Sequence, residues 1–202
     1  MKEQLLTSML GSGKIAILGF GREGRSGFDT IRRLLPLAPI CIADRNKQAV
    51  LPENLENTEV CLGENYLDCL SDADLILKSP GIPHFLLDEL KLKARITSQT
   101  ELFLGCYRNQ TIGITGTKGK STTASLLYHL LSSCGIPTQL LGNIGIPPFE
   151  RMEQITPQTR IVFEMSSHQL ERIGVSPHLA IFLNIFPEHL DHYKGFEGYL
   201  AA

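Results

Sequence analysis

Residues 111–121 read TIGITGTKGKS and decide the fold of the second half of the chain. The first five are apolar or β-branched, as in a short buried strand, and residues 116–121 form a glycine-rich turn. A helical pattern follows, ended by Gly135 and Pro137. Its core-facing stripe consists of Ala124, Leu127, Tyr128 and Leu131. Strand, glycine turn and helix in this order predict an α/β unit with a phosphate-binding loop.

This loop has the residues that bind a triphosphate. Gly119-Lys120-Ser121 places a lysine for the β- and γ-phosphates beside a hydroxyl that can ligate Mg²⁺. The literal eight-residue pattern has a glycine where Ile114 stands, so this is a variant loop whose first glycine is Gly116. A chance Gly-Lys-Ser is common, but the strand before it and the helix after it favour a triphosphate site.

Polar residues also follow two later predicted strands. Glu164 ends the strand at 161–163, where the crevice of an open parallel sheet places functional groups, and a carboxylate there can hold Mg²⁺. A solvated acid at a strand end is the alternative interpretation. Asn184 and His189 follow a strand predicted at 179–185. A zinc site at His189 and His192 is disfavoured, because no further Cys or His cluster completes it in the sequence.

The first half of the chain begins in the same way. A strand at 14–20 runs into G-x-G-x-x-G at 19–24, and a helix stopped by Pro36 follows. Asp44 ends the next strand, where a carboxylate can accept hydrogen bonds from a ribose or a base. We favour nucleotide binding over the alternative that the glycines serve only tight packing of helix against strand.

Two strand-loop-helix starts imply two α/β domains. We place the boundary near Ser98, which gives domains 1–98 and 99–202. Two such loops in one chain indicate an enzyme that couples ATP to a second ligand, since a dehydrogenase needs only the first and a simple ATPase only the second. The other predicted elements are a helix at 85–92, a polar stretch at 151–159, and buried strands at 39–43, 59–62, 74–78, 94–97, 161–163 and 179–185.

Composition narrows the class of protein. The 202 residues are 43% hydrophobic and carry a net charge of −2, which is typical of a globular protein and does not point to nucleic acid. No apolar run is long enough to span a bilayer, and the N-terminus does not resemble a secretory signal. The five cysteines are scattered without C-x-x-C spacing, so we interpret them as buried, reduced thiols.

Six motifs in order make the chain resemble the Mur ligase family. The loop at 115–121 and the blocks at 164–171 and 184–191 are similar to the motifs of the whole family. The motifs at 19–26 and 79–82 resemble those of the members that add D-glutamate to UDP-N-acetylmuramoyl-L-alanine. The sixth motif is Gly142-Asn143-Ile144-Gly145.

The resemblance implies a Rossmann-like parallel-sheet domain that binds the UDP precursor, followed by part of a P-loop ATPase-type α/β central domain. Its implied catalytic residues are Lys120, Glu164 and His189, and its implied metal ligands are Ser121, Glu164 and His189. The implied ATP-binding residues are Gly116, Thr117, Lys118, Gly119, Lys120, Ser121, Thr122 and Asn143. The implied substrate-binding residues are Gly21, Arg22, Glu23, Gly24, Arg25, Ser26, Asp44, Arg45, Ser79, Pro80, Gly81, Asn143, Ser166, Gln169 and His189.

The implied reaction is ATP- and Mg²⁺-dependent amide formation in peptidoglycan precursor synthesis. The precursor carboxylate attacks the γ-phosphate to give an acyl phosphate, and the amine of D-glutamate then displaces phosphate. Such an enzyme is expected in the cytoplasm, with small-molecule substrates and neither nucleic acid nor membrane as partner. Lys118 stands where many members have asparagine, which puts the fine chemistry of the loop in doubt.

The resemblance also implies a truncated member, because the sequence stops before the family's carbamylated lysine and C-terminal domain. We therefore expect this chain to lack ligase activity and to expose apolar surface that favours self-association. Two alternatives remain. The chain is another Mur ligase or a folylpolyglutamate synthase relative, or it is a non-catalytic nucleotide-binding module.

Overall fold

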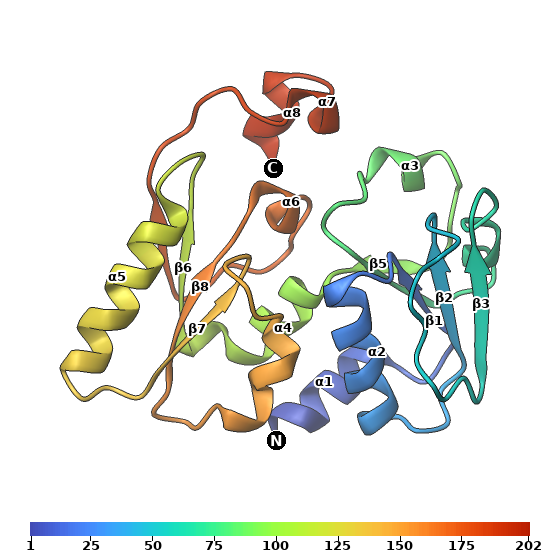
Figure 1. Ribbon diagram of the computed structural model, residues 1–202, viewed down its shortest axis with the longest axis horizontal. Helices are drawn as coiled ribbons and strands as arrows, with labels where there is room; N and C mark the ends of the chain where they lie inside the picture. Colours follow the sequence, from blue (N-terminus) through green and yellow to red (C-terminus); the bar gives the residue numbers. More distant parts are fainter. The chain divides into compact units, whose positions relative to one another are not determined.

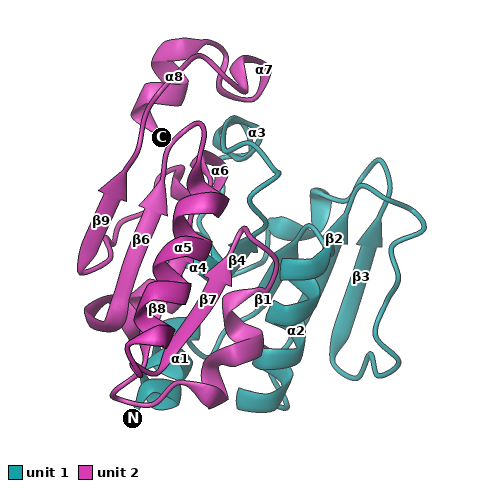
Figure 2. Cartoon of the chain, turned by 60° about the vertical axis from the view of Figure 1, so that its left-hand side comes forward, with its two compact units in different colours: residues 1–102 teal, residues 103–202 magenta.

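The computed structural model describes all 202 residues and divides into two compact units, residues 1–102 and 103–202 (Figures 1 and 2). The division falls inside helix α4 (Gln99–Tyr107), four residues beyond the boundary expected from the sequence. Each unit is a parallel sheet with helices, so the expected α/β class is confirmed. No helix has both the length and the apolar character that crossing a membrane requires.

Unit 1 is built on a five-stranded parallel sheet in the order β3-β2-β1-β4-β5. Every residue of β1 and β4 is buried, as expected for inner strands of a parallel sheet. The elements in chain order are α1 (Lys2–Leu10), β1 (Ile15–Leu18), α2 (Arg22–Leu34), β2 (Ile40–Asp44), β3 (Thr58–Leu62), η1 (Asp68–Leu70), β4 (Leu75–Lys78), α3 (Phe85–Asp88) and β5 (Arg95–Thr97).

Unit 2 is built on a four-stranded sheet in the order β7-β8-β6-β9, again all parallel. The sequence missed β7, and it also missed the helices α1, α4, α6, α7 and α8. The elements are η2 (Arg108–Gln110), β6 (Thr111–Thr115), α5 (Lys120–Ser133), β7 (Thr138–Gly142), η3 (Pro148–Gln154), β8 (Arg160–Glu164), α6 (Ser167–Leu170), β9 (Leu179–Phe182), α7 (Leu190–Tyr193) and α8 (Phe196–Ala201).

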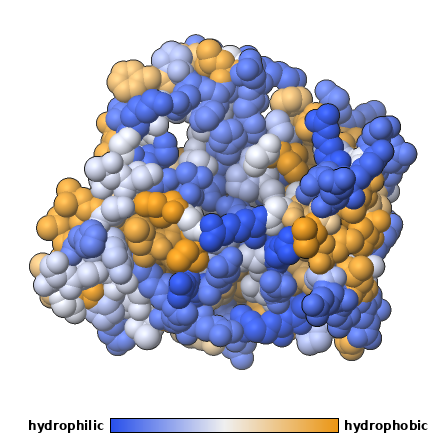
Figure 3. Space-filling view, viewed as in Figure 1, coloured by the Kyte–Doolittle hydropathy of each residue, from blue (hydrophilic) through white to orange (hydrophobic).

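Helix α5 packs on its sheet through the predicted stripe. Ala124 is buried with Ile114 and Val162, and the other stripe residues pack against them. The opposite face of α5 exposes Leu126 and Leu130, at 58% and 56% of their surface. Figure 3 shows hydrophobic surface along the edge of the molecule where α5 lies.

Three expectations need correction. The strand expected to be buried at 179–185 is β9, an edge strand that ends at Phe182, and its Leu179 and Phe182 side chains are 55% and 62% exposed. Self-association through this apolar edge stays a prediction. The helix expected at 85–92 is a single turn, α3. Of the five cysteines expected to be buried, Cys61 is half-buried and Cys134 is exposed. Position at the edge of a sheet, which hydropathy does not encode, accounts for the exposure of β9.

Candidate functional site

The loop between β6 and α5 has the backbone geometry of an anion site. Gly116 has a φ of 139°, and Gly119, the N-cap of α5, is left-handed with a φ of 87°. Glycine adopts these angles without the steric cost that a Cβ brings. The first amides of α5 have no partner within the helix, so they and the helix dipole favour an anion at this end.

Asn184, just beyond β9, clamps the loop. Its Oδ1 accepts from the amide of Lys118 at 2.9 Å, and its Nδ2 donates to the carbonyl of Lys118 at 3.0 Å. The carbonyl of Asn184 also accepts from the amide of Thr117 at 2.9 Å. The sequence placed Asn184 at a strand end and at the start of the block 184–191 but assigned it no role.

Thr117 ties the loop to the segments after β9. Its Oγ1 accepts from the amide of Phe186 at 2.9 Å and lies 2.8 Å from the hydroxyl of Tyr199. Thr117 and Tyr199 are both buried. The threonine therefore holds the loop in place, and Tyr199 is a further contributor that the sequence did not single out.

Two lysines bring positive charge to the loop. The Lys120 ammonium donates to the carbonyls of Gly116 at 2.6 Å and Thr117 at 3.0 Å, so it lies over the turn. Lys118 is exposed, and its Nζ lies 2.5 Å from Glu188 Oε1. The hydrogen bond from Lys118 holds the pKa of Glu188 below its usual value. Lys120 is thus the cation at the loop, whereas Lys118 is engaged by a carboxylate.

Glu164 is a buried carboxylate at the carboxyl end of β8. Its backbone pairs with Ile114 of β6 and Gly142 of β7, and only 1% of the residue is exposed. Oε1 accepts from Asn143 Nδ2 at 2.8 Å, whereas Oε2 is buried without a hydrogen-bond partner. Burying a carboxylate oxygen without a partner is costly, so this atom fits an ion that the site is built to receive.

The donor set suits Mg²⁺ in part. Mg²⁺ prefers oxygen ligands, which the Glu164 carboxylate and the Ser121 hydroxyl at the start of α5 can supply. The unpartnered Oε2 of Glu164 is the atom that fits best. An imidazole is a ligand better suited to transition metals, so His189 fits this ion less well.

His189 is held at the start of α7 with a left-handed φ of 55°. Its ring packs against His168, with ring centroids 4.7 Å apart, and lies 6.4 Å from the Tyr199 ring. His168 also packs against His192 at 4.2 Å, and no sequence argument singled it out. His192 is engaged in turn, with Nε2 3.3 Å from Glu171 Oε2.

A pocket of about 340 Å³ in unit 2 brings several predicted residues together. Its lining includes Gly116, Lys120, Ser166, Asn184 and His189. Ser166 also forms a capping box with Gln169 at the start of α6, so Gln169, which is buried outside the lining, fixes the position of Ser166. Asn143, Ser121, Thr122 and Glu164 are not part of this lining. The pocket thus gathers the lysine, a hydroxyl and an imidazole beside the loop.

The glycine loop of unit 1 is held by residues from both neighbouring strands. The amide of Phe20 donates to Asp44 Oδ2 at 2.5 Å, and Ser79 Oγ donates to the carbonyl of Gly19 at 2.8 Å. A Cβ on Gly24 would lie 2.0 Å from the carbonyl oxygen of Gly19. Only glycine at position 24 therefore allows α2 to approach the loop this closely. Asp44, Ser79 and the loop therefore meet at the carboxyl edge of the sheet, where β1 lies between β2 and β4.

Lys78 is a residue that sequence reasoning missed. It ends the apolar strand β4, is 3% exposed, and donates from Nζ to the carbonyl of Ile82 at 2.7 Å. This bond holds the turn that contains Ser79, Pro80 and Gly81. A lysine at the end of an apolar strand was the available signal.

The remaining predicted residues of unit 1 differ in their exposure to solvent and in their hydrogen-bond partners. Arg22, Arg45 and Gly81 are exposed, and Glu23 is half-buried. The Arg25 guanidinium donates to the carbonyl of Val50 at 3.0 Å. Ser26 is buried, and its Oγ accepts from Gln99 Nε2 at 3.4 Å. Ser26 therefore faces the interior of unit 1, away from solvent.

Comparison with known proteins gives concordant matches. Residues 114–202 match the Mur ligase middle domain. The chain is 36% identical over 198 residues to UDP-N-acetylmuramoylalanine–D-glutamate ligase of Clostridium kluyveri, with 94% of this chain and 43% of the relative covered. It is 37% identical, with the same coverage, to the protein of that name from Clostridium botulinum (strain Hall). The chain thus spans less than half the length of the curated relatives it matches.

Among solved structures, one match is UDP-N-acetylmuramate:L-alanyl-gamma-D-glutamyl-meso-diaminopimelate ligase from Neisseria meningitides. The identity is 19% and the TM-score 0.49, with 94% of this chain and 65% of that chain covered.

Proposed function

Because the chain belongs to the Mur ligase family, we propose that it is the nucleotide-binding part of an enzyme that adds D-glutamate to UDP-N-acetylmuramoyl-L-alanine. The relatives that cover 94% of the chain carry that activity in their names. Unit 1 binds the UDP end of the precursor, and unit 2 binds ATP with Mg²⁺. The enzyme acts in the cytoplasm.

The observation that carries this proposal is the pairing of two features in one sheet of unit 2. A glycine loop that caps α5 and holds Lys120 follows β6, and a buried carboxylate with an unpartnered oxygen ends the adjacent strand β8. Helix amides and a lysine attract polyphosphate, and the carboxylate attracts a divalent cation. Binding of a magnesium nucleotide needs this combination.

In the proposed mechanism the residues mainly position groups and stabilise charge. Amides at the start of α5 and the Lys120 ammonium bind phosphate oxygens, and Glu164 and Ser121 hold the cation. Bound Mg²⁺ supplies positive charge that offsets the charge of the phosphates. The precursor carboxylate attacks the γ-phosphorus as ADP leaves, and an acyl phosphate forms. The D-glutamate amine then attacks the acyl carbon, loses a proton and expels phosphate.

His189 and Ser166 line the same pocket as Lys120, next to the place proposed for the phosphates. In our proposal they orient the precursor carboxylate or the phosphate that it attacks. Preorganised hydrogen-bond donors at such a place stabilise developing negative charge without further reorganisation.

The test is calorimetric titration of the chain with ATP at rising Mg²⁺, using Glu164→Gln as the variant. The substitution keeps the size and the acceptor of the side chain and removes its charge. We expect the Mg²⁺ concentration that supports ATP binding to rise at least about tenfold. ATP binding that does not depend on Mg²⁺, or that the variant leaves unchanged, would contradict the proposed role.

The two alternatives can be separated by ligand and by turnover. UDP-N-acetylmuramoyl-L-alanine should bind the chain in competition with UDP, which a folylpolyglutamate synthase relative would not show. A non-catalytic nucleotide-binding module would bind ATP and UDP without forming ADP, even in a chain extended to the full length of the relatives. We expect the 202-residue chain to form no amide product, and product from the purified chain would refute this.

A further inference from the structure

Three cysteines in unit 1 converge on one point although they are scattered in the sequence. They are Cys41 on β2, Cys61 on β3 and Cys69 on η1. Their sulfur atoms all lie within 4.8 Å of one another. All three are free thiols, so no disulfide accounts for the cluster.

The register of the sheet brings two of them together. Cys41 is opposite Glu59, and Ala43 is opposite Cys61, on the paired strands β2 and β3. Side chains two residues apart along a strand share a face, so Cys41 and Cys61 are diagonal neighbours on one face. The short helix η1 packs over this face and places Cys69 against Cys41 in the same apolar cluster.

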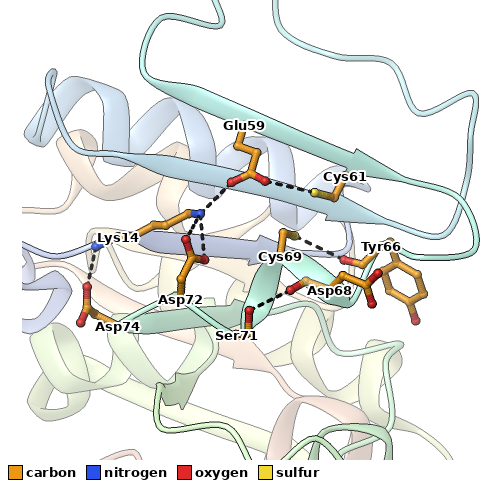
Figure 4. A network of polar contacts seen from close by, with 9 residues as sticks. All are labelled: Lys14, Glu59, Cys61, Tyr66, Asp68, Cys69, Ser71, Asp72 and Asp74. Atoms are coloured by element: carbon orange, nitrogen blue, oxygen red, sulfur yellow. Dashed lines mark hydrogen bonds and ion pairs between the residues drawn. The ribbon is translucent and has the colours of Figure 1, made fainter.

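The surroundings combine an apolar interior with one polar side. Cys41 and Cys69 are 0% and 7% exposed, whereas Cys61 is half-buried and gives an ion access from solvent. On the polar side, Cys61 Sγ lies 3.6 Å from Glu59 Oε1, and Lys14 Nζ lies 2.7 Å from Glu59 Oε2 (Figure 4). Lys14 is also paired with Asp72, so this side of the cluster carries charged groups of both signs.

Hydrogen bonds link the three thiols. Hydrogen bonds from the Cys41 and Cys61 thiols lower the pKa of Cys69 to about 7, so it is the sulfur most readily ionised. Burial raises the pKa of Cys61 to about 12. A cation bound between the sulfurs displaces these protons to solvent, because the thiolate is the form of cysteine that ligates metals.

The spacing suits a metal better than a disulfide. Parallel strands lie about 4.8 Å apart and rise about 3.3 Å per residue, so diagonal neighbours two residues apart have Cα atoms roughly 8 Å apart. Disulfides need about 4.4–6.8 Å, so Cys41 and Cys61 cannot be bridged without movement of the backbone. Zinc–sulfur bonds are about 2.3 Å long, which sets three sulfurs around one ion about 4 Å apart. That separation agrees with the convergence of the three sulfurs within 4.8 Å.

We propose that Cys41, Cys61 and Cys69 bind one thiophilic metal ion, Zn²⁺ or Cu⁺, through three sulfur ligands. Thiolates select these ions over Mg²⁺, so the site is chemically separate from the one proposed in unit 2. The ion would join the edge strand β3 and η1 to β2, whose last residue, Asp44, holds the glycine loop. Its binding therefore stabilises the part of unit 1 that supports this loop.

The test uses the reduced, metal-free 202-residue chain, titrated anaerobically with Cd²⁺ as a spectroscopic probe and with Zn²⁺ and Cu⁺ against chromogenic chelators. We expect one ion per chain and a thiolate-to-Cd²⁺ charge-transfer band. Cys61→Ser, at the half-buried position, should lose the band, whereas Cys134→Ser, at an exposed position in unit 2, should keep it. In each titration the chain competes with a chelator of known affinity. The ion that the chain withdraws from its chelator with the higher affinity is the preferred ion.

A measurement without variants guards against misfolding. In the wild-type chain, iodoacetamide followed by mass spectrometry should label the three clustered cysteines faster without metal than with it, and Cys134 should be labelled at the same rate in both cases. A wild-type chain that takes up no Cd²⁺, or in which metal leaves the labelling rate of all three clustered cysteines unchanged, would overturn the proposal. A band that Cys61→Ser retains would overturn it as well.

Discussion

The two glycine loops start alike and differ in the charges around them. Each follows an inner strand of a parallel sheet and leads into a helix, β1 into α2 and β6 into α5. In unit 1 both Asp44 oxygens are occupied, accepting from the amides of Phe20 at 2.5 Å and Asn46 at 2.7 Å. In unit 2 the carboxylate of Glu164 keeps one oxygen without a partner, and an ammonium lies over the loop.

The difference indicates that one local fold serves two kinds of recognition. The unit 1 loop is shaped by close packing and by its own hydrogen bonds, which suits a ligand that approaches the backbone. The unit 2 loop adds a fixed cation and an unsatisfied anion, which suits a triphosphate carrying a metal. Fold alone would not separate these functions, since function depends on the site.

Removing the cation of the second loop should have the largest effect. Lys120→Ala should weaken ATP binding by about 1.5–3 kcal/mol, or roughly 10- to 150-fold, because a charged hydrogen-bond donor is lost. Calorimetry with ATP and Mg²⁺ measures it. Lys118→Ala is the matched control and should have the smaller effect, because Glu188 already engages that lysine. Equal losses in both variants would mean that Lys120 has no special role.

Adding a side chain where α2 approaches the first loop should lower the stability of unit 1. Gly24→Ala places a Cβ 2.0 Å from the Gly19 carbonyl oxygen and should lower the free energy of unfolding of unit 1 by about 1–3 kcal/mol. Urea unfolding measures this. At Gly81 a Cβ would meet nothing within 4 Å, so Gly81→Ala is the control for a glycine change in the same unit. A Gly24→Ala variant as stable as the wild type would contradict tight packing of α2 against the Gly19 carbonyl.

The hydroxyl that holds the first loop should contribute less. Ser79→Ala removes the bond to the Gly19 carbonyl and should cost about 1 kcal/mol in unfolding free energy. Binding of a UDP ligand should weaken as well, because the loop loses a hydrogen bond that fixes its position. Ser8→Ala, at an exposed position in α1, serves as the control. Unchanged stability and unchanged UDP binding would show that this bond does not hold the loop.

The smallest effect is expected where Lys14, just before β1, pairs with Asp72. The hydrogen bond from Lys14 lowers the pKa of Asp72. A lowered folded-state pKa gives stability that is present above the unfolded pKa, about 3.9, and is lost as the pH falls through the folded value. Asp72→Asn should therefore flatten the acid limb of the stability curve.

Urea unfolding of the wild type and Asp72→Asn at a series of acid pH values tests this difference. The pair is exposed and screened by salt, so the effect should shrink in high salt. If stability falls with acid in the same way in both proteins, the Lys14–Asp72 pair does not contribute to it.

Much of each sheet follows from local pattern. Short apolar runs predicted seven of the nine strands close to their observed bounds, an eighth (β9) with the wrong burial, and missed only β7. β7 reads TQLLG, in which two polar residues precede two leucines, so it shows neither a continuous apolar run nor a regular alternation. The helix from Lys120 followed from the spacing of its apolar stripe. Exposure of β9 depends on which strands flank it, and hydropathy along the chain carries no such information.

The site divides in the same way. Glycine spacing and the adjacent lysine and serine predict the phosphate loop, because backbone freedom and charge there depend on neighbours in sequence. The clamp of Asn184 on Lys118 and the contact of Tyr199 with Thr117 join residues far apart in the chain. Contacts of this kind leave no periodic signal in one sequence.

The sequence by itself determined the α/β class, the two glycine loops, Lys120 in the second loop and the carboxylates at strand ends. Tertiary structure alone decided that Asp44 is satisfied while Glu164 is not, and that Cys41, Cys61 and Cys69 meet. The physical reason is that local propensity acts between neighbours along the chain. The burial and pairing of a polar atom depend on strand order, register and the helix packed above them.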